Sequence, residues 1–166
     1  THHSSGSVAV QELRNNSQAI VAQLNDTIWA LKKDALSLTA ISDRIKTFIQ
    51  RIQNSYPAIT INVMENIDND RMLSPSHAFH LFRIVQEAIN NALKHSKGTK
   101  VDIIIESIAS NWKITIADNG AGIMQRSKDG NGLVNMKERA QETGWSIDWL
   151  SEPGKGTSVI ISSTTN

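Results

Sequence analysis

The apolar residues change from a helical to an alternating period near Tyr56 and Pro57, and this change is the strongest constraint on the fold. Residues 8–33 contain neither Gly nor Pro. Their apolar heptad a and d positions are Val10, Leu13, Ile20, Leu24 and Leu31. After Pro57, every second residue of 59–63 is β-branched and apolar, which is typical of a strand with one buried face. The sequence therefore predicts a helical segment followed by a domain that contains a sheet.

The helix predicted over residues 8–33 needs a partner for its apolar seam. Its length and 3.5-residue period favour pairing with a helix of a second chain, and packing on its own domain is the alternative. A second amphipathic helix is predicted over residues 39–53. Residues 1–7 read THHSSGS, which we interpret as the remnant of an expression tag, with a natural terminus as the alternative. We expect three parts: 1–7, a helical segment over 8–54 and a globular domain over 55–166.

The globular part alternates strands and helices. Ser74 and Pro75 mark a helix start, because a hydroxyl side chain caps the first amides and proline tolerates the first helical position. The expected order is strand 59–63, turn 65–71, helix 75–95, strands 99–107 and 112–118, helix 133–143, and strands 145–151 and 157–163. This order predicts an α/β fold, a two-layer sandwich of a mixed sheet with helices on one face.

Composition excludes several classes of function. The chain has 166 residues, no Cys, and 17 Lys and Arg against 16 Asp and Glu, for a net charge of +1. Without Cys there is no disulfide framework, thiolate zinc site or thiol nucleophile. Scattered charges of near-zero sum argue against a nucleic-acid partner. No apolar run reaches the ~20 residues that cross a bilayer. Composition therefore excludes cysteine-based chemistry and gives no general electrostatic attraction to nucleic acid.

Two polar segments stand out beside predicted elements. Glu87 and Asn91 lie four residues apart on one helix face, where a carboxylate and an amide oxygen could hold a hydrated Mg²⁺ and orient a hydroxyl. An exposed polar stripe is the alternative. Asp118 ends a predicted strand and precedes Gly120 and Gly122. A carboxylate there can accept a hydrogen bond from the exocyclic amine of adenine and repels the carbonyl of guanine, and an Asn-Gly turn is the alternative.

Two further segments are rich in glycine. Gly130 and Gly132 open the helix predicted over 133–143, whose free amides suit an anion, although the dinucleotide and P-loop patterns are both incomplete. Residues 154–157 form a tight turn before the last strand, and a plain hairpin turn is as good an interpretation as a ligand contact. Each segment alone is modest evidence, but their order along the chain is specific.

Residues 79–161 resemble the ATP-binding domain of the GHKL superfamily, which groups gyrase-type ATPases, a heat-shock chaperone, histidine kinases and mismatch-repair ATPases. The sequence is similar in detail to the catalytic domain of bacterial sensor histidine kinases that pair with helix-turn-helix response regulators. Residues 87–96 match the family's asparagine box, 118–123 its first glycine box and 130–140 its second. The pattern Gly-x-Gly-Leu-x-Asn-Met-x-x-Arg-Ala is complete in the last of these. The resemblance implies a Bergerat-type ATP-binding fold over 55–166, preceded by a helical dimerisation segment.

The resemblance also implies roles for individual residues. Asn91 would bind Mg²⁺ on the ATP phosphates, and Glu87 would act as a base or polarising group toward the acceptor imidazole. Asp118 would select adenine. The other residues implied to contact the nucleotide are Lys94, His95, Gly120, Gly122, Ile123, Gly130, Gly132, Leu133 and Thr157. The cofactors expected are therefore ATP and Mg²⁺.

One departure from the family concerns the phosphate acceptor. These kinases carry the acceptor histidine on an earlier helix rich in Arg, Glu, His and Asp, and no such block is present. The sequence is therefore expected to be a piece of a histidine phosphotransferase that lacks its own substrate. The expected partners are a second copy through the amino-terminal helices and a response-regulator receiver domain, with a cytoplasmic location in a membrane-anchored parent. There are two alternatives, which are a serine kinase of the anti-sigma-factor type and a nucleotide-binding dimerisation module without activity.

Overall fold

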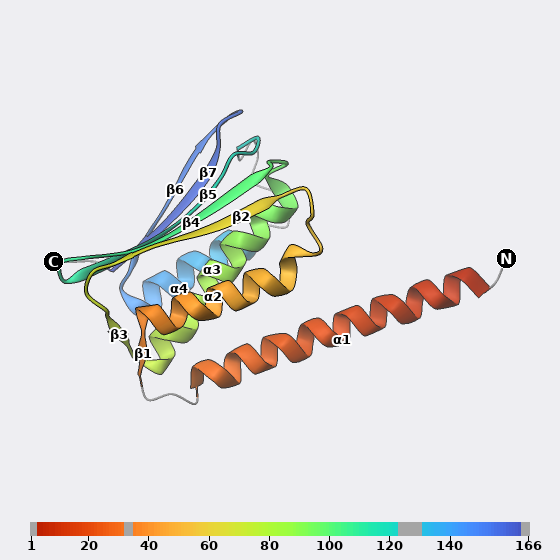
Figure 1. Ribbon diagram of the computed structural model, residues 1–166, viewed down its shortest axis with the longest axis horizontal. Coiled ribbons are helices and arrows are strands. Elements are labelled where there is room, and N and C mark those ends of the chain that lie inside the picture. Colours follow the sequence, from red (N-terminus) through yellow and green to blue (C-terminus); the bar gives the residue numbers. More distant parts are fainter. Residues whose placement is uncertain (1–2, 32–34, 123–130, 164–166) are drawn as a thin grey trace.

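A five-stranded sheet covered on one face by helices forms the body of the protein, and one long helix extends away from it (Figure 1). The computed structural model describes residues 3–31, 35–122 and 131–163. Its elements are α1 (His3–Leu31), β1 (Leu36–Ser37), α2 (Leu38–Gln53), β2 (Thr60–Ile67), β3 (Met72–Leu73), α3 (Pro75–His95), β4 (Lys100–Ile108), β5 (Asn111–Asp118), α4 (Asn131–Thr143), β6 (Ser146–Glu152) and β7 (Gly156–Ser162). The α/β sandwich predicted from the sequence is confirmed.

The sheet is mixed, with strand order β2-β4-β5-β7-β6. β2 and β4 are parallel and are connected through α3, whereas the remaining neighbours are antiparallel. The two-residue strands β1 and β3 pair with each other outside this sheet, and the sequence analysis missed both. A parallel pair needs a crossover connection, and the resulting crossover helix, α3, packs in the layer beside the sheet.

The predicted turn over residues 65–71 is wrong at its start, because β2 continues to Ile67. Glu65 pairs with Ile105 of β4 in the strand register. Its carboxylate accepts a hydrogen bond from the buried Ser42 hydroxyl of α2 and lies 2.6 Å from the Lys46 ammonium. These tertiary partners satisfy a charged side chain within a strand, and no local sequence rule reports them.

α2 belongs to the same core as α3 and the sheet. Leu38, Ile41 and Ile45 of α2 are fully buried, and the Phe48 ring packs edge-on against Phe82 of α3 with centroids 6.3 Å apart. Burying one such aliphatic or aromatic side chain contributes about 1.5–3 kcal/mol relative to leaving it exposed. The apolar face predicted for residues 39–53 is therefore directed at the α/β domain.

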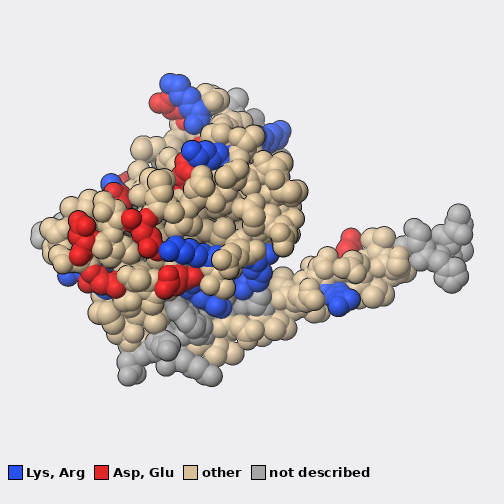
Figure 2. Space-filling view, in the orientation of Figure 1, with Lys and Arg blue, Asp and Glu red and all other residues tan. Residues whose placement is uncertain are grey.

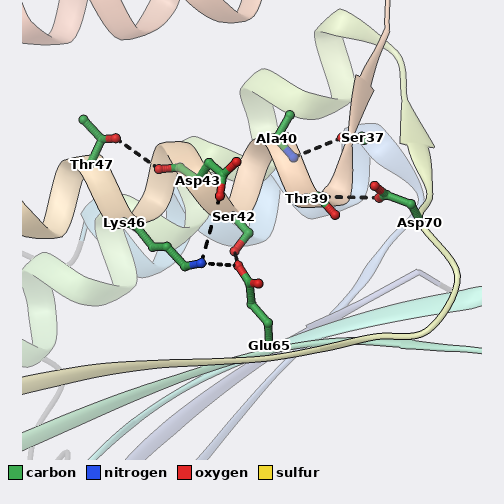
Figure 3. A network of polar contacts seen from close by, with 9 residues as sticks. All are labelled: Ser37, Thr39, Ala40, Ser42, Asp43, Lys46, Thr47, Glu65 and Asp70. Carbon is green, nitrogen blue, oxygen red and sulfur yellow. Dashed lines mark hydrogen bonds and ion pairs between the residues drawn. The ribbon is translucent and has the colours of Figure 1, made fainter.

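Polar contacts hold the first half of α2 in place (Figure 3). The Ser37 hydroxyl accepts a hydrogen bond from the Ala40 amide at 3.0 Å and caps the helix, while the Asp70 carboxylate accepts one from the Thr39 amide at 3.2 Å. Hydrogen bonds from Lys46, and then from Ser42, lower the pKa of Glu65 despite some opposing desolvation. The Ser42–Lys46–Glu65 cluster thus joins α2 to the edge strand β2.

α4 lies against α3 through a small mixed cluster. Its Met136 and Ala140 side chains are buried. The Arg139 guanidinium lies 5.4 Å from the centroid of the Phe79 ring, and its Nη1 lies 3.0 Å from His80 Nδ1. Desolvation, together with the charge of Arg139, lowers the pKa of His80 against the opposing effect of Glu142. The orientation of α4 is therefore set by packing against the first half of α3.

α1 begins at His3, five residues before the predicted start, contacts α3, and extends beyond the body (Figure 1). Its exposed apolar side chains include Val10, Leu13, Ile20, Leu24 and Ile28. Figure 2 shows little charge on the part of α1 that projects from the body, and residues 3–31 contain only Glu12, Arg14 and Asp26 as charged residues. In the described part of the chain, no helix combines the length and hydropathy that crossing a bilayer requires. A weakly charged helix with an exposed apolar seam remains available for a partner.

Candidate functional site

The end of β5, the end of α3 and the turn between β6 and β7 meet at one place, where several predicted site residues lie. The Ala121 amide donates a hydrogen bond to the Ser96 carbonyl at 2.7 Å, just beyond the last turn of α3. On the other side, the Gly154 amide donates to the Ala121 carbonyl at 2.9 Å. The residues that follow Asp118 are therefore held between a helix end and a hairpin turn.

Asp118 lies at the centre of this junction and is half-buried. Its Oδ1 accepts hydrogen bonds from the Gly120 amide at 2.9 Å and from the Thr157 amide at 3.2 Å. Both hydrogen bonds use the same carboxylate oxygen, and none to Oδ2 is recorded among the described residues. The structure thus brings Asp118, Gly120 and Thr157 together, although the sequence separates Thr157 from Asp118 by 39 residues.

The glycines of the junction allow backbone segments to approach each other closely. A Cβ on Gly120 would lie 2.0 Å from the Ser96 carbonyl oxygen, and a Cβ on Gly122, which has φ +81°, would lie 2.6 Å from that of Glu152. A Cβ on Gly156, at φ +93°, would lie 2.0 Å from the Asp118 carbonyl oxygen. The resemblance implies that Gly120 and Gly122 contact the nucleotide. The structure adds that these two glycines, together with Gly156, let three chain segments pack closely; Gly156 is not among the residues implied to contact the nucleotide.

The predicted residues of α3 occupy its second half. Glu87 and Asn91 are half-buried and lie one turn apart, and Lys94 and His95 are exposed in the last turn. The helix ends at Ser96, whose amide donates to the Ala92 carbonyl and whose carbonyl accepts the Ala121 amide. Lys94 and His95 therefore stand directly before the contact between α3 and the Asp118 junction, and Asn91 lies one turn further back.

Only part of the second glycine-rich segment can be placed. Gly132 lies in the first turn of α4, and Leu133 is half-buried there. The predicted site residues Ile123 and Gly130 lie outside the described residues. Amides at the start of a helix have no partners within the helix and favour an anion, so the first turn of α4 fits the predicted phosphate contact.

Two residues at the junction were missed by the sequence analysis. Ser96 supplies the carbonyl against which Gly120 packs. Asn119 makes three side-chain hydrogen bonds to Thr99 and Lys100. From the sequence, the Asn-Gly pair indicates only a turn, and no local pattern places Asn119 beside residues that precede it by about twenty positions.

A separate groove of about 600 Å³ lies between α1 and α2. It is lined by Ser17, Gln18, Val21, Asn25, Arg44 and Arg51. None of the predicted site residues is among them, so we locate the candidate site at the Asp118 junction.

Comparison with known sequences assigns this fold and site to a class. Residues 76–164, more than half of the chain, match the family of histidine kinase-, DNA gyrase B- and HSP90-like ATPases. The chain belongs to this family, and the matched segment contains every predicted site residue.

Within that family, the chain is related to sensor histidine kinases. It is 30% identical over 156 residues to the histidine-protein kinase/phosphatase DegS of Brevibacillus brevis, an alignment that covers 92% of this chain and 40% of DegS. It is 33% identical over 138 residues to the sensor protein VraS of Staphylococcus saprophyticus, an alignment that covers 82% of this chain and 39% of VraS. The sensor histidine kinase LiaS of Bacillus subtilis is 41% identical over 94 residues, which covers 55% of this chain and 26% of LiaS. The chain thus spans two fifths or less of the length of these relatives.

Solved structures agree on the fold. The histidine kinase domain of the Erythrobacter litoralis EL346 blue-light activated kinase superposes with a TM-score of 0.66 at 23% identity, covering 98% of this chain and 87% of that one. The Acinetobacter baumannii histidine kinase AdeS gives a TM-score of 0.66 at 16% identity, covering 96% and 85%. Both matches cover most of the chain, so its fold recurs in these kinases.

Proposed function

We propose that this chain binds Mg-ATP at the Asp118 junction and serves as the catalytic domain of a two-component sensor histidine kinase. The γ-phosphoryl group would pass to a histidine on a dimerisation helix that lies outside this sequence. The observation that carries the proposal is the Asp118 carboxylate, which two backbone amides hold at the point where α3, β5 and the β6–β7 hairpin meet. Membership of the ATPase family and the kinase relatives support it.

The adenine end of the site is built around Asp118. With Oδ1 engaged by the amides of Gly120 and Thr157, Oδ2 can accept a hydrogen bond from the exocyclic amine of adenine. Guanine presents a carbonyl at that position, and two acceptors repel each other. A hydrogen bond to a charged group contributes about 1.5–3 kcal/mol, which corresponds to a factor of about ten to a hundred in affinity.

The phosphate end lies toward α3 and α4. Amides in the first turn of α4, near Gly132 and Leu133, can bind phosphate oxygens, with Lys94 adding positive charge and His95 a ring N–H donor from the end of α3. The Asn91 amide oxygen suits Mg²⁺, which typically combines a few protein oxygens with phosphates and water. When bound, the cation would neutralise charge on the phosphates. Glu87, one turn before Asn91, would accept a proton from the attacking imidazole or polarise it.

The remaining segments suggest partners. The exposed apolar seam of α1 fits the same helix of a second copy, which gives a homodimer. A response-regulator receiver domain would accept the phosphoryl group, and the parent protein would be anchored in a membrane with this part in the cytoplasm. We also propose that the catalytic domain starts near Leu36 instead of residue 55, because α2 is buried in its core. Residues 1–7 remain assigned to a tag remnant.

Nucleotide binding is the first test. Asp118→Asn should weaken ATP binding by about ten- to a hundredfold in calorimetry with Mg²⁺, and should leave GTP binding weak. Asp148→Asn is the matched control, because Asp148 is an exposed carboxylate of β6. It pairs with Ile160 of β7 and not with Thr157, the residue that contacts Asp118. Unchanged ATP affinity in Asp118→Asn, or no ATP binding by the unaltered chain, would overturn the assignment.

Phosphoryl transfer is the second test and needs a longer chain that contains the acceptor helix. Glu87→Gln and Asn91→Asp should each suppress labelling from γ-labelled ATP. Label on histidine is lost in acid, whereas label on serine survives, so acid treatment separates the histidine kinase from the serine kinase alternative. Acid-stable label would contradict the proposal.

A further inference from the structure

Asn119 is an exposed residue whose side chain is nonetheless fixed by its neighbours. Its Oδ1 accepts hydrogen bonds from the Thr99 amide and the Lys100 amide, each at 2.9 Å, and its Nδ2 donates to the Thr99 hydroxyl at 3.1 Å. Its backbone amide donates to the Lys100 carbonyl at 3.3 Å. Both lone pairs of the side-chain oxygen are thus used, and the residue is attached to one two-residue segment at four points.

These contacts lie where the pairing of β4 with β5 ends. The last pair in the antiparallel register is Val101 with Asp118, so Asn119 stands opposite the residue that begins β4. Its side-chain oxygen accepts the amides of Thr99 and Lys100 at the start of β4. The backbone of Gly120 can then turn away from the sheet toward Ser96. The chain therefore leaves the sheet immediately after Asp118, in a direction that Asn119 fixes.

The neighbouring turn is adapted to this side chain. A Cβ on Gly98 would lie 2.5 Å from Asn119 Oδ1 and 2.9 Å from the Gly120 amide nitrogen. Gly98 does not have a positive φ, so its lack of a side chain is explained by the approach of Asn119 and not by a strained backbone. The fit between Gly98 and Asn119 is an observation independent of the hydrogen bonds.

The consequence concerns the carboxylate beside it. Gly120, the residue after Asn119, supplies one of the two amides that hold Asp118 Oδ1. Because both the backbone amide and the side chain of Asn119 are attached to Thr99 and Lys100, the direction in which the chain continues to the Gly120 amide is restricted. We propose that Asn119 is a positioning residue that aims the Asp118 carboxylate and thereby sets the preference for adenine over guanine nucleotides. This inference rests on the proposed function, since it assumes that Asp118 contacts the base.

The ratio of the dissociation constants of GTP and ATP is the measurement that isolates this role. Both nucleotides carry the same triphosphate, so a general effect on phosphate binding or on stability cancels in the ratio. Asn119→Ala should lower the ratio at least about threefold, since it removes the hydrogen bonds that orient the Gly120 amide. Asn119→Asp keeps an oxygen for the two amides and should retain more of the ratio than Asn119→Ala. Asn62→Ala is the matched control, because Asn62 is an exposed residue of β2 whose side chain bonds only Asp102 among the described contacts.

Gly98→Ala tests the same idea without substituting a residue of the loop that follows Asp118. Its methyl group displaces the Asn119 side chain, so the ratio should fall as it does in Asn119→Ala. This variant and Asn119→Asp carry the test if Asn119→Ala does not fold. A lowered melting temperature with an unchanged ratio in Asn119→Ala or Gly98→Ala would assign these residues a purely structural role and overturn the inference. An unaltered chain that binds ATP no better than GTP would instead refute the proposed function, and this inference with it.

Discussion

The two glycines of the β6–β7 turn provide a sharp test of the junction around Asp118. Gly154 and Gly156 both have positive φ, at +78° and +93°. A Cβ on Gly154 would meet no atom within 4 Å, whereas a Cβ on Gly156 would lie 2.0 Å from the Asp118 carbonyl oxygen. Alanine at either position is strained by its backbone conformation, but only at Gly156 does it also push the turn away from Asp118.

The expected magnitudes follow from these two effects. A left-handed conformation costs an alanine about 1–2 kcal/mol, so Gly154→Ala should lower the free energy of unfolding by that amount. Gly156→Ala should add the loss of the hydrogen bond from the Thr157 amide to the Asp118 carboxylate, about 1.5–3 kcal/mol. For a chain of this size, the additional loss corresponds to a melting temperature about 3–12 °C below that of Gly154→Ala.

Thermal unfolding followed by circular dichroism measures the stability difference, and calorimetry with Mg-ATP measures the consequence for the site. Gly156→Ala should weaken ATP binding because Asp118 loses one of its two amide donors, and Gly154→Ala should bind ATP as the unaltered chain does. Equal stability and equal ATP affinity in the two variants would refute the close approach of the turn to Asp118.

Two other predictions concern pH and the contact of α2 with the sheet. The pKa of His80 is lowered from 6.5, so the unfolded chain takes up a proton at this residue before the folded chain does as the pH falls. The contribution of His80 to the free energy of unfolding should therefore be full above about pH 6.5 and decline below it. His80→Gln should remove this part of the decline in melting curves taken between pH 5 and 7.5. Lys46→Ala should cost about 0.5–1 kcal/mol in urea unfolding at pH 7, because it removes the nearest partner of the Glu65 carboxylate. The lowered pKa of Glu65 means that its contribution is present above 4.5 and is lost as the pH falls further, so the effect of Lys46→Ala should vanish in acid. Lys155→Ala, which breaks an exposed pair with Glu152, is the control and should change stability less.

Local signals were sufficient for most elements. The helix over 75–95 agrees with α3 because Ser74 caps it, accepting the His77 amide, and Pro75 starts it. Alternating apolar residues located the strands of the sheet, and their order with the helices predicted the sandwich. Local signals failed where a tertiary partner overrides them, as at Glu65, which lies within β2 because Ser42 and Lys46 of α2 satisfy its charge. The short strands β1 and β3 carry too few residues for any periodic pattern.

The sequence by itself determined which chemical groups this protein carries and on which kind of element each one lies, because periodicity, caps and glycine spacing act within a few residues. Asp118 at a strand end, Asn91 on a helix and Gly132 at a helix start could all be read in this way. Only the tertiary structure decided that Thr157 and Gly156 contact Asp118, that Asn119 forms hydrogen bonds with the start of β4, and that α2 belongs to the core. These contacts join segments far apart in the chain, and their free energy depends on close packing between backbones, which no local pattern of residues encodes.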